Sequence, residues 1–212
     1  MATSTTAVRA EPRTTRSTDD SDPVLDAALA AFLDFGIRRT SMGEIARRAG
    51  ISPATLYRRY AAKSDVVMAV GLREANRDIA AIDARIDTSA PPAEQLTQMY
   101  LEVSRRLRGN RLLRRVLDTE PETVLPRLTL EAAPLLDIGR SYLADFLVRL
   151  QREGHVPSYD VTPVVDWLAR HAQSETLTPT PTAPSEDDVR DFVHHHLAPF
   201  VGIARNDVEG AR

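Results

Sequence analysis

The side chains best suited to chemistry are crowded into residues 40–63, which read TSMGEIARRAGISPATLYRRYAAK. They carry hydroxyl, phenol, guanidinium and ammonium groups. These groups donate hydrogen bonds to phosphate oxygens and to the edges of nucleic-acid bases. Four of them share one outer face in the second half of the stretch: Thr55, Tyr57, Arg58 and Arg59. This set of donors indicates contact with DNA.

Two short helices joined by a tight turn are predicted to position these donors. Ser41 and Glu44 have the spacing of a capping box, in which the hydroxyl caps the first turn and the carboxylate reaches back to the cap. Gly50 is expected to end the first helix, because glycine enters a left-handed conformation without steric cost. Ser52 caps the second helix, which begins at Pro53. So short a turn makes the helices cross steeply, as in a helix-turn-helix.

The charge of the chain is unevenly divided. The whole chain has a net charge of -3, whereas residues 23–63 hold seven basic and three acidic residues. That segment is therefore at +4, and the rest of the chain is at -7. A basic module on an acidic body is typical of a DNA-binding head.

Many positions of this stretch agree in order and spacing with a known signature: Thr40-Ser41-Met42, Ile45-Ala46, Ala49-Gly50-Ile51-Ser52, Thr55-Leu56-Tyr57 and Lys63. On these residues the sequence resembles the TetR family of bacterial transcriptional regulators. The sequence departs from the family pattern at Ala54, Arg59 and Tyr60, where the family usually has Gly, His and Phe.

The resemblance implies a role for each of eight residues in this stretch. Four are expected to hold phosphates: Thr40, Ser41, Tyr57 and Lys63. Three are expected to make base or mixed contacts: Thr55, Arg58 and Arg59. Ser52 suits either role. Lys63 is the only lysine among 27 basic residues, which favours a point charge at this position, although a solvated lysine at a helix start is the alternative.

Residues 22–63 are therefore expected to form a three-helix DNA-binding domain. Its first helix begins at Asp22-Pro23 and ends at Gly36. Residues 1–21 are rich in Thr and Ser and have almost no large apolar side chain, which predicts a disordered N-terminal arm. The alternative is that the arginines of this arm enter a neighbouring minor groove.

Residues 64–204 are expected to form a larger helical domain, followed by a C-terminal tail at residues 205–212. Apolar residues recur at helical spacing in the segments 64–86, 93–108, 110–117, 130–152, 161–173 and 185–200. Pro121 and Pro126 predict an irregular turn. No segment has the alternation of a strand, so the predicted fold is all-α, with a helix-turn-helix head before a larger helical body.

The resemblance further implies that the body binds a small hydrophobic or lipid-like effector, which releases a palindromic operator, and that the regulated genes serve efflux or lipid metabolism. Eight residues are expected to line the pocket: Met99, Tyr100, Val103, Leu113, Leu117, Tyr142, Phe146 and Trp167. The alternative is that these side chains form ordinary core.

A homodimer is also expected, because the last two amphipathic helices look too apolar for a free surface. Six residues are predicted to contact the second copy: Val164, Leu168, Phe192, Val193, Leu197 and Phe200. A two-fold dimer would place its two recognition helices about 34 Å apart, one turn of the duplex.

Other function classes have little support in the sequence. There is no cysteine, which removes disulfides and thiol chemistry. No segment predicts a signal peptide or membrane span, so a cytoplasmic protein is expected. No motif points to an enzyme or a cofactor, and His194, His195 and His196 point in different directions on a helix, which disfavours a metal site. The remaining alternative is a helical protein-interaction adaptor with a basic head.

Overall fold

Three helices form the head at one end of the molecule: α1 (Pro23–Phe35), α2 (Met42–Arg48) and α3 (Pro53–Arg59). The computed structural model describes residues 21–178 and 182–203. Except for Ser21, the predicted arm at 1–21 and the tail at 205–212 lie outside these residues. Within the described ranges every regular element is a helix, so the all-α prediction is confirmed.

The predicted caps of the head helices are present. The side chains of Asp22, Ser41 and Ser52 accept backbone N–H groups at the starts of α1, α2 and α3. Gly50 has φ +68°, and the amides of Gly50 and Ile51 donate to carbonyls of the last turn of α2. This pair of bonds is a Schellman motif, which ends α2 within one residue and lets α3 start at once.

The head has its own apolar core. Phe32, Ile45 and Leu56 are fully buried and come from α1, α2 and α3 respectively. Val66 of α4 (Lys63–Asp83) and Val116 of α6 (Arg111–Thr119) complete this cluster. Helix α4, which continues into the body, and helix α6 of the body therefore share the core of the head.

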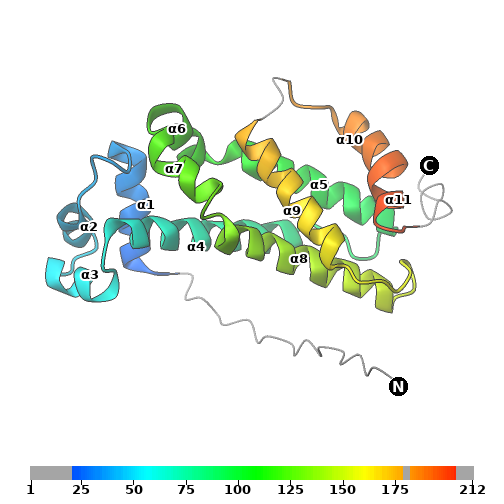
Figure 1. Cartoon of the computed structure of the whole chain (residues 1–212), viewed down its shortest axis with the longest axis horizontal. Helices are drawn as coiled ribbons and strands as arrows, with labels where there is room; N and C mark the ends of the chain where they lie inside the picture. The colour runs from blue at the N-terminus through cyan, green and yellow to red at the C-terminus, as the bar shows by residue number, and fades with distance from the viewer. Residues whose placement is uncertain (1–20, 179–181, 204–212) are drawn as a thin grey trace, which may run out of the picture.

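The body is built around α4, which runs from the head into the body beside α8 (Ala133–Arg152) (Figure 1). In the view of Figure 1 the other body helices lie above these two. They are α5 (Pro92–Gly109), α6, α7 (Pro121–Leu128), α9 (Thr162–Leu177), α10 (Glu186–Phe192), the π-helix η1 (Val193–Leu197) and α11 (Ala198–Phe200). No helix among the described residues is long and apolar enough to cross a membrane.

Two predictions about the body are corrected by the structure. Residues 121–128 form α7 rather than an irregular turn. Pro121 starts this helix, where no N–H is needed, and Pro126 stands near its end, where little helix remains to be disrupted. The predicted helix at 130–152 starts at Ala133, with Pro134 in its first turn.

Candidate functional site

The outer face of α3 presents two side chains without a hydrogen-bonding partner among the described residues. Leu56 points into the head and is fully buried, whereas Tyr57 is 53% exposed and Arg58 is exposed as well. Within the described part of the chain, neither Tyr57 nor Arg58 has a side-chain hydrogen bond or ion pair. Their predicted contact with DNA stays a prediction, and their geometry is compatible with it.

Ser52 and Thr55 lie at the start of the same helix. Ser52 Oγ accepts the Thr55 N–H at 3.1 Å and lies 2.9 Å from Thr55 Oγ1. Ser41 has the same capping role in α2, where its Oγ accepts the Glu44 N–H at 3.1 Å. Both serines are exposed, so a phosphate can approach these helix starts without displacing other side chains.

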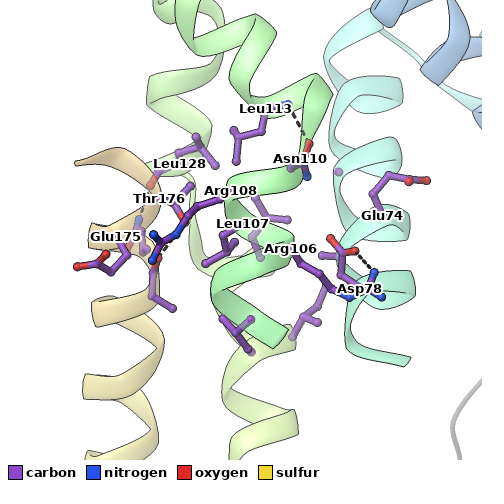
Figure 2. Close-up of a pocket in the computed structure, with 18 of the residues that line it drawn as sticks. Glu74, Asp78, Arg106, Leu107, Arg108, Asn110, Leu113, Leu128, Glu175 and Thr176 are labelled. Carbon is purple, nitrogen blue, oxygen red and sulfur yellow. Dashed lines mark hydrogen bonds and ion pairs between the residues drawn. The ribbon is translucent and has the colours of Figure 1, made fainter. Parts of the chain in front are cut away.

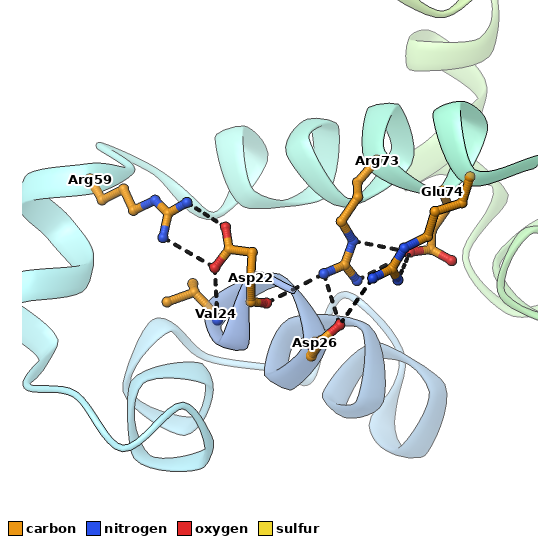
Figure 3. Close-up of polar contacts among 7 residues, drawn as sticks. Asp22, Val24, Asp26, Arg59, Arg73 and Glu74 are labelled. Atoms are coloured by element: carbon orange, nitrogen blue, oxygen red, sulfur yellow. Dashed lines mark hydrogen bonds and ion pairs between the residues drawn. The ribbon is translucent and has the colours of Figure 1, made fainter. Parts of the chain in front are cut away.

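Arg59 is engaged within the protein. Its guanidinium pairs with both carboxylate oxygens of Asp22, the N-cap of α1 (Figure 3). Asp22 is 8% exposed and also accepts the Val24 N–H at 3.0 Å. The predicted base contact of Arg59 is therefore not prepared in this structure, because the side chain must first leave a well-held carboxylate.

Thr40 and Lys63 are also directed inward, against the prediction that they bind phosphate. Thr40 is 1% exposed, and its hydroxyl donates to the carbonyl of Gly36 at 2.7 Å. Lys63 Nζ lies 2.9 to 3.1 Å from the carbonyl oxygens of Ile37, Arg38 and Thr40. An ammonium has three protons, so Lys63 is fully used in holding the loop that leads into α2. The only lysine of the chain thus has a structural role in this loop, which its position in the sequence did not reveal.

Part of the basic charge of the head is neutralised locally. Glu44 accepts hydrogen bonds from Arg47 and Arg48, which lower the pKa of its carboxyl to about 2. The Glu44 carboxylate is therefore engaged by these two arginines. These bonds replace the predicted hydrogen bond from the backbone N–H of Ser41, which was the second half of the capping box. Arg48 also pairs with Asp34 at 2.7 Å. Among the described residues, Arg58 of α3 is consequently an exposed cation without an ion pair.

A buried carboxylate joins the head to the body. Glu120, between α6 and α7, is 5% exposed and accepts the backbone N–H of Arg38 at 2.7 Å. It packs against Gly36, where a Cβ would lie 2.2 Å from Glu120 Oε1. No local signal in the sequence predicts this contact, because its partners are 82 residues apart.

A second polar connection runs from α1 to α4. Arg73 is 6% exposed and donates to Asp26 Oδ1 at 2.8 Å and to Glu74 Oε1 at 3.1 Å (Figure 3). It also approaches the backbone carbonyl of Asp22 at 3.4 Å. A buried cation requires such partners, and they tie the start of α1 to the middle of α4.

A partly open pocket of about 1330 Å³ lies between the head and α9. Seven of the eight predicted pocket residues line it: Met99, Tyr100, Val103, Leu113, Leu117, Tyr142 and Trp167. Phe146 does not. It is 6% exposed in the body core, with the guanidinium of Arg149 over its ring.

Polar groups also reach the cavity wall. Arg106 of α5 donates to Asp78 of α4 at 2.9 Å, and Arg108 turns toward Glu175 and Thr176 of α9 (Figure 2). Glu74 belongs to this wall and to the Arg73 network. The arrangement can hold a largely apolar molecule with a few polar atoms, and it connects the cavity to the head.

The predicted dimerisation residues divide between two faces. Phe192 and Phe200 are 39% and 49% exposed, and Trp167 is 51% exposed beside Phe200, with a ring-centroid distance of 5.0 Å. Val164 is half-buried near this face. In contrast, Leu168, Val193 and Leu197 are buried in the core of their own chain and cannot contact a partner. The outward residues are thus the ones that remain candidates.

The histidine run is not arranged as a metal site. His195 Nδ1 lies 2.8 Å from the carbonyl of Asp191, and burial lowers the pKa of His194. No group of three or more His, Cys, Asp or Glu in residues 21–178 and 182–203 is placed to hold a metal ion.

Comparisons with known proteins identify a family match for the head and relatives of most of the chain. The family described as "Bacterial regulatory proteins, tetR family" matches residues 24–70. An uncharacterized HTH-type transcriptional regulator of Mycobacterium bovis is 30% identical over 156 residues, which are 74% of this chain and 79% of the relative.

Two solved structures have a similar fold. The TetR family repressor AlkX from a Dietzia strain, implicated in biodegradation of n-alkanes, has a TM-score of 0.69 at 20% identity, over 86% of this chain and 99% of AlkX. The fatty acid degradation regulator FadR from Bacillus halodurans has a TM-score of 0.56 at 16% identity, over 81% and 93% of the two chains. At these identities the structures establish the fold alone.

Proposed function

The chain belongs to the TetR family of bacterial transcriptional regulators, and from this premise we propose that it is a dimeric, ligand-responsive repressor. It is a DNA-binding regulator of transcription and not an enzyme. The observation that carries the DNA-binding role is the exposed pair Tyr57 and Arg58, whose side chains have no hydrogen bond or ion pair among the described residues, on a short helix that follows the turn at Gly50.

The proposed operator contacts use donors at the starts of α2 and α3 and on the outer face of α3. Ser41, Ser52 and Tyr57 bind phosphates, while Arg58 and Thr55 face the base edges. Arg59 joins them only when it exchanges Asp22 for DNA. Thr40 and Lys63 do not contact DNA in this proposal; their hydrogen bonds hold the loop before α2. Acting on the chromosome, the protein would work in the cytoplasm.

The proposed dimer uses the outward face of α9 and of the last helices. Trp167, Phe192 and Phe200 are large apolar side chains exposed there, and burying them against a second copy removes apolar surface from water. A two-fold dimer then presents two α3 helices to successive major grooves, which requires a palindromic operator.

The proposed effector is a small hydrophobic or lipid-like molecule that occupies the cavity and releases the operator. The largely apolar wall supports this choice. AlkX is implicated in biodegradation of n-alkanes, and FadR is a regulator of fatty acid degradation. Both descriptions are in keeping with regulated genes for lipid metabolism or for efflux of hydrophobic compounds.

The test is selection of genomic DNA fragments of the source organism by the purified protein at physiological salt, with the Arg58→Ala variant in parallel. Enrichment of one palindrome by the wild type, weakened or relaxed in the variant, would support the proposal. Retention without sequence preference would refute it and favour the adaptor with a basic head, because specific regulators hold their sites far more tightly than bulk DNA.

A further inference from the structure

The positive charge that the head can offer to DNA is smaller than its sequence suggests. Residues 23–63 contain six arginines and one lysine. Four of the arginines pair with carboxylates: Arg38, Arg47, Arg48 and Arg59. Lys63 is occupied by backbone carbonyls. The two others, Arg39 and Arg58, are exposed, and neither has a side-chain hydrogen bond or ion pair among residues 21–178 and 182–203.

Arg39 has no role in the operator contacts proposed above. It lies in the turn between α1 and α2, two residues before Ser41, the N-cap of α2. Thr40 is 1% exposed, whereas Arg39 and Ser41 on either side of it are exposed. The chain therefore turns Thr40 into the head and leaves the Arg39 side chain in solvent.

The backbone on both sides of Arg39 is held in place. Lys63 Nζ lies 2.9 to 3.1 Å from the carbonyl oxygens of the two residues before Arg39 and of Thr40 after it. Glu120 of the body accepts the N–H of Arg38 at 2.7 Å. A contact made from a fixed backbone costs less conformational entropy on binding than one made from a mobile loop. Only the side chain of Arg39 has to be ordered when it binds.

The docking of a helix-turn-helix brings this turn to the DNA backbone. When the second helix of the motif lies in the major groove, the first helix crosses the sugar-phosphate backbone. In this chain the first helix is α2, and Arg39 stands just before it. A side chain at this place meets phosphates rather than base edges. A guanidinium suits a phosphate, because two of its N–H groups can donate to the phosphate oxygens together.

We propose that Arg39 is a further DNA-binding residue, which contacts a phosphate of the operator beside α2. This inference rests on the proposed function, in which the outer face of α3 contacts the operator. The added contact strengthens binding to any duplex and carries no sequence information. Arg58, in contrast, is the cation proposed to face the base edges.

Arg38 is the competing cation in the same turn. Its guanidinium lies 3.7 Å from the carboxylate of Glu122 on α7, and its backbone N–H donates to Glu120. The Arg38 side chain is therefore directed toward the body. An exposed ion pair of this kind is weak, so Arg38 is included in the test.

The experiment measures binding of two labelled duplexes by fluorescence anisotropy, over a salt series from about 50 to 300 mM. One duplex is the most enriched fragment of the genomic selection, and the other is a shuffled sequence of the same length and composition. Arg39→Gln is compared with the wild type and with Arg152→Gln. Arg152 is exposed and has no side-chain partner in the described part of the chain. It ends α8, far from the head (Figure 1).

The two glutamine variants remove the same charge, so a difference between them reports the position of the arginine. Circular dichroism and urea unfolding verify that each variant is folded. Because both side chains are exposed, each variant should keep its stability within about 0.5 kcal/mol of the wild type.

We expect Arg39→Gln to weaken both duplexes by the same factor, at least about 3-fold, as for the loss of one hydrogen bond. The slope of log Kd against log salt concentration should fall by about one unit for each head that is bound. Arg152→Gln should leave the slope unchanged. Arg58→Ala should weaken the enriched fragment more than the shuffled duplex, because a base contact depends on sequence.

An unchanged slope in Arg39→Gln, or an equal loss in Arg152→Gln, would overturn the inference. So would a loss confined to the enriched fragment, or a lower slope in Arg38→Gln but not in Arg39→Gln. These results would leave the proposed function intact, because the selection of one palindrome and its dependence on Arg58 decide it.

The proposed function can also fail separately. A wild type that binds both duplexes equally would refute a sequence-specific regulator, while a lower slope in Arg39→Gln would still uphold the phosphate contact. A wild type that binds neither duplex at the lowest salt concentration would refute both.

Discussion

The guanidinium of Arg59, at the end of α3, pairs with both carboxylate oxygens of Asp22, the residue that caps α1. Helix α3 is thereby attached to the N-cap residue of α1. The same Asp22 offers its backbone carbonyl to Arg73 of α4. Asp22 is thus the common partner of Arg59, a cation that DNA could use, and of Arg73, which holds α1 and α4 together.

Asp22→Asn should release Arg59 while preserving the cap, because asparagine is as good an N-cap as aspartate. A freed arginine that binds a phosphate should steepen the dependence of log Kd on log salt concentration by about one unit. The measurement is operator affinity across a salt series. The steepening should vanish in Asp22→Asn combined with Arg59→Gln. An unchanged slope in the single variant would mean that Arg59 does not reach DNA.

Lys63→Met should lower the free energy of unfolding by about 2 kcal/mol, since hydrogen bonds to a charged group are lost from three carbonyls. Urea unfolding measures this change, and Arg58→Met, on the free face of α3, should leave stability within about 0.5 kcal/mol of the wild type. If Lys63→Met kept full stability and lost only operator affinity, a phosphate contact would be its role after all.

Gly36→Ala should be destabilising for two separable reasons. The backbone at Gly36, with φ 82° and ψ 164°, lies in a region that only glycine adopts readily, and a side chain there costs about 1–3 kcal/mol. The added Cβ would also collide with Glu120.

A double-mutant cycle separates the two causes. Gly36→Ala should cost at least about 1 kcal/mol less in a Glu120→Ala background than in the wild type, because the collision is removed. Glu120→Ala alone should cost about 1–3 kcal/mol, since it leaves the partly buried Arg38 N–H without its partner. Strictly additive costs in urea unfolding would show that the two residues are not in contact.

Phe200→Asp should convert the proposed dimer to monomers, because it places a charge in the face that Trp167 and Phe200 expose. Leu130→Asp is the matched control, since Leu130 is 92% exposed between α7 and α8, outside the helices that carry Trp167 and Phe200. Sedimentation velocity distinguishes the two states. A monomeric wild type, or a Phe200→Asp variant that stays dimeric, would contradict the proposed interface.

The order of the head helices was predictable because the signals that start and end them are local. Asp22, Ser41 and Ser52 cap groups within three residues of themselves, and Gly50 adopts its left-handed conformation within the turn. The outward direction of Tyr57 and Arg58 follows from the inward direction of Leu56 and the helical period.

The two apolar stripes of the last helices could not be ranked from the sequence. Val193 and Leu197 form one stripe, and Phe192 and Phe200 form the other. Each has helical spacing, and only the packing against α5 decides that Val193 is buried and Phe200 is exposed. The prediction that combined both stripes into one dimer face was therefore wrong for the buried pair.

The sequence by itself determined the helical class, the helix-turn-helix and the outward direction of Tyr57 and Arg58, because capping, turn conformation and apolar period act over a few residues. Only the tertiary structure decided how Thr40, Arg59 and Lys63 are used and that Glu120 joins body to head. Their hydrogen bonds reach groups up to 82 residues away. Such pairings depend on which surfaces meet when the helices pack, and residue spacing along the chain does not encode them.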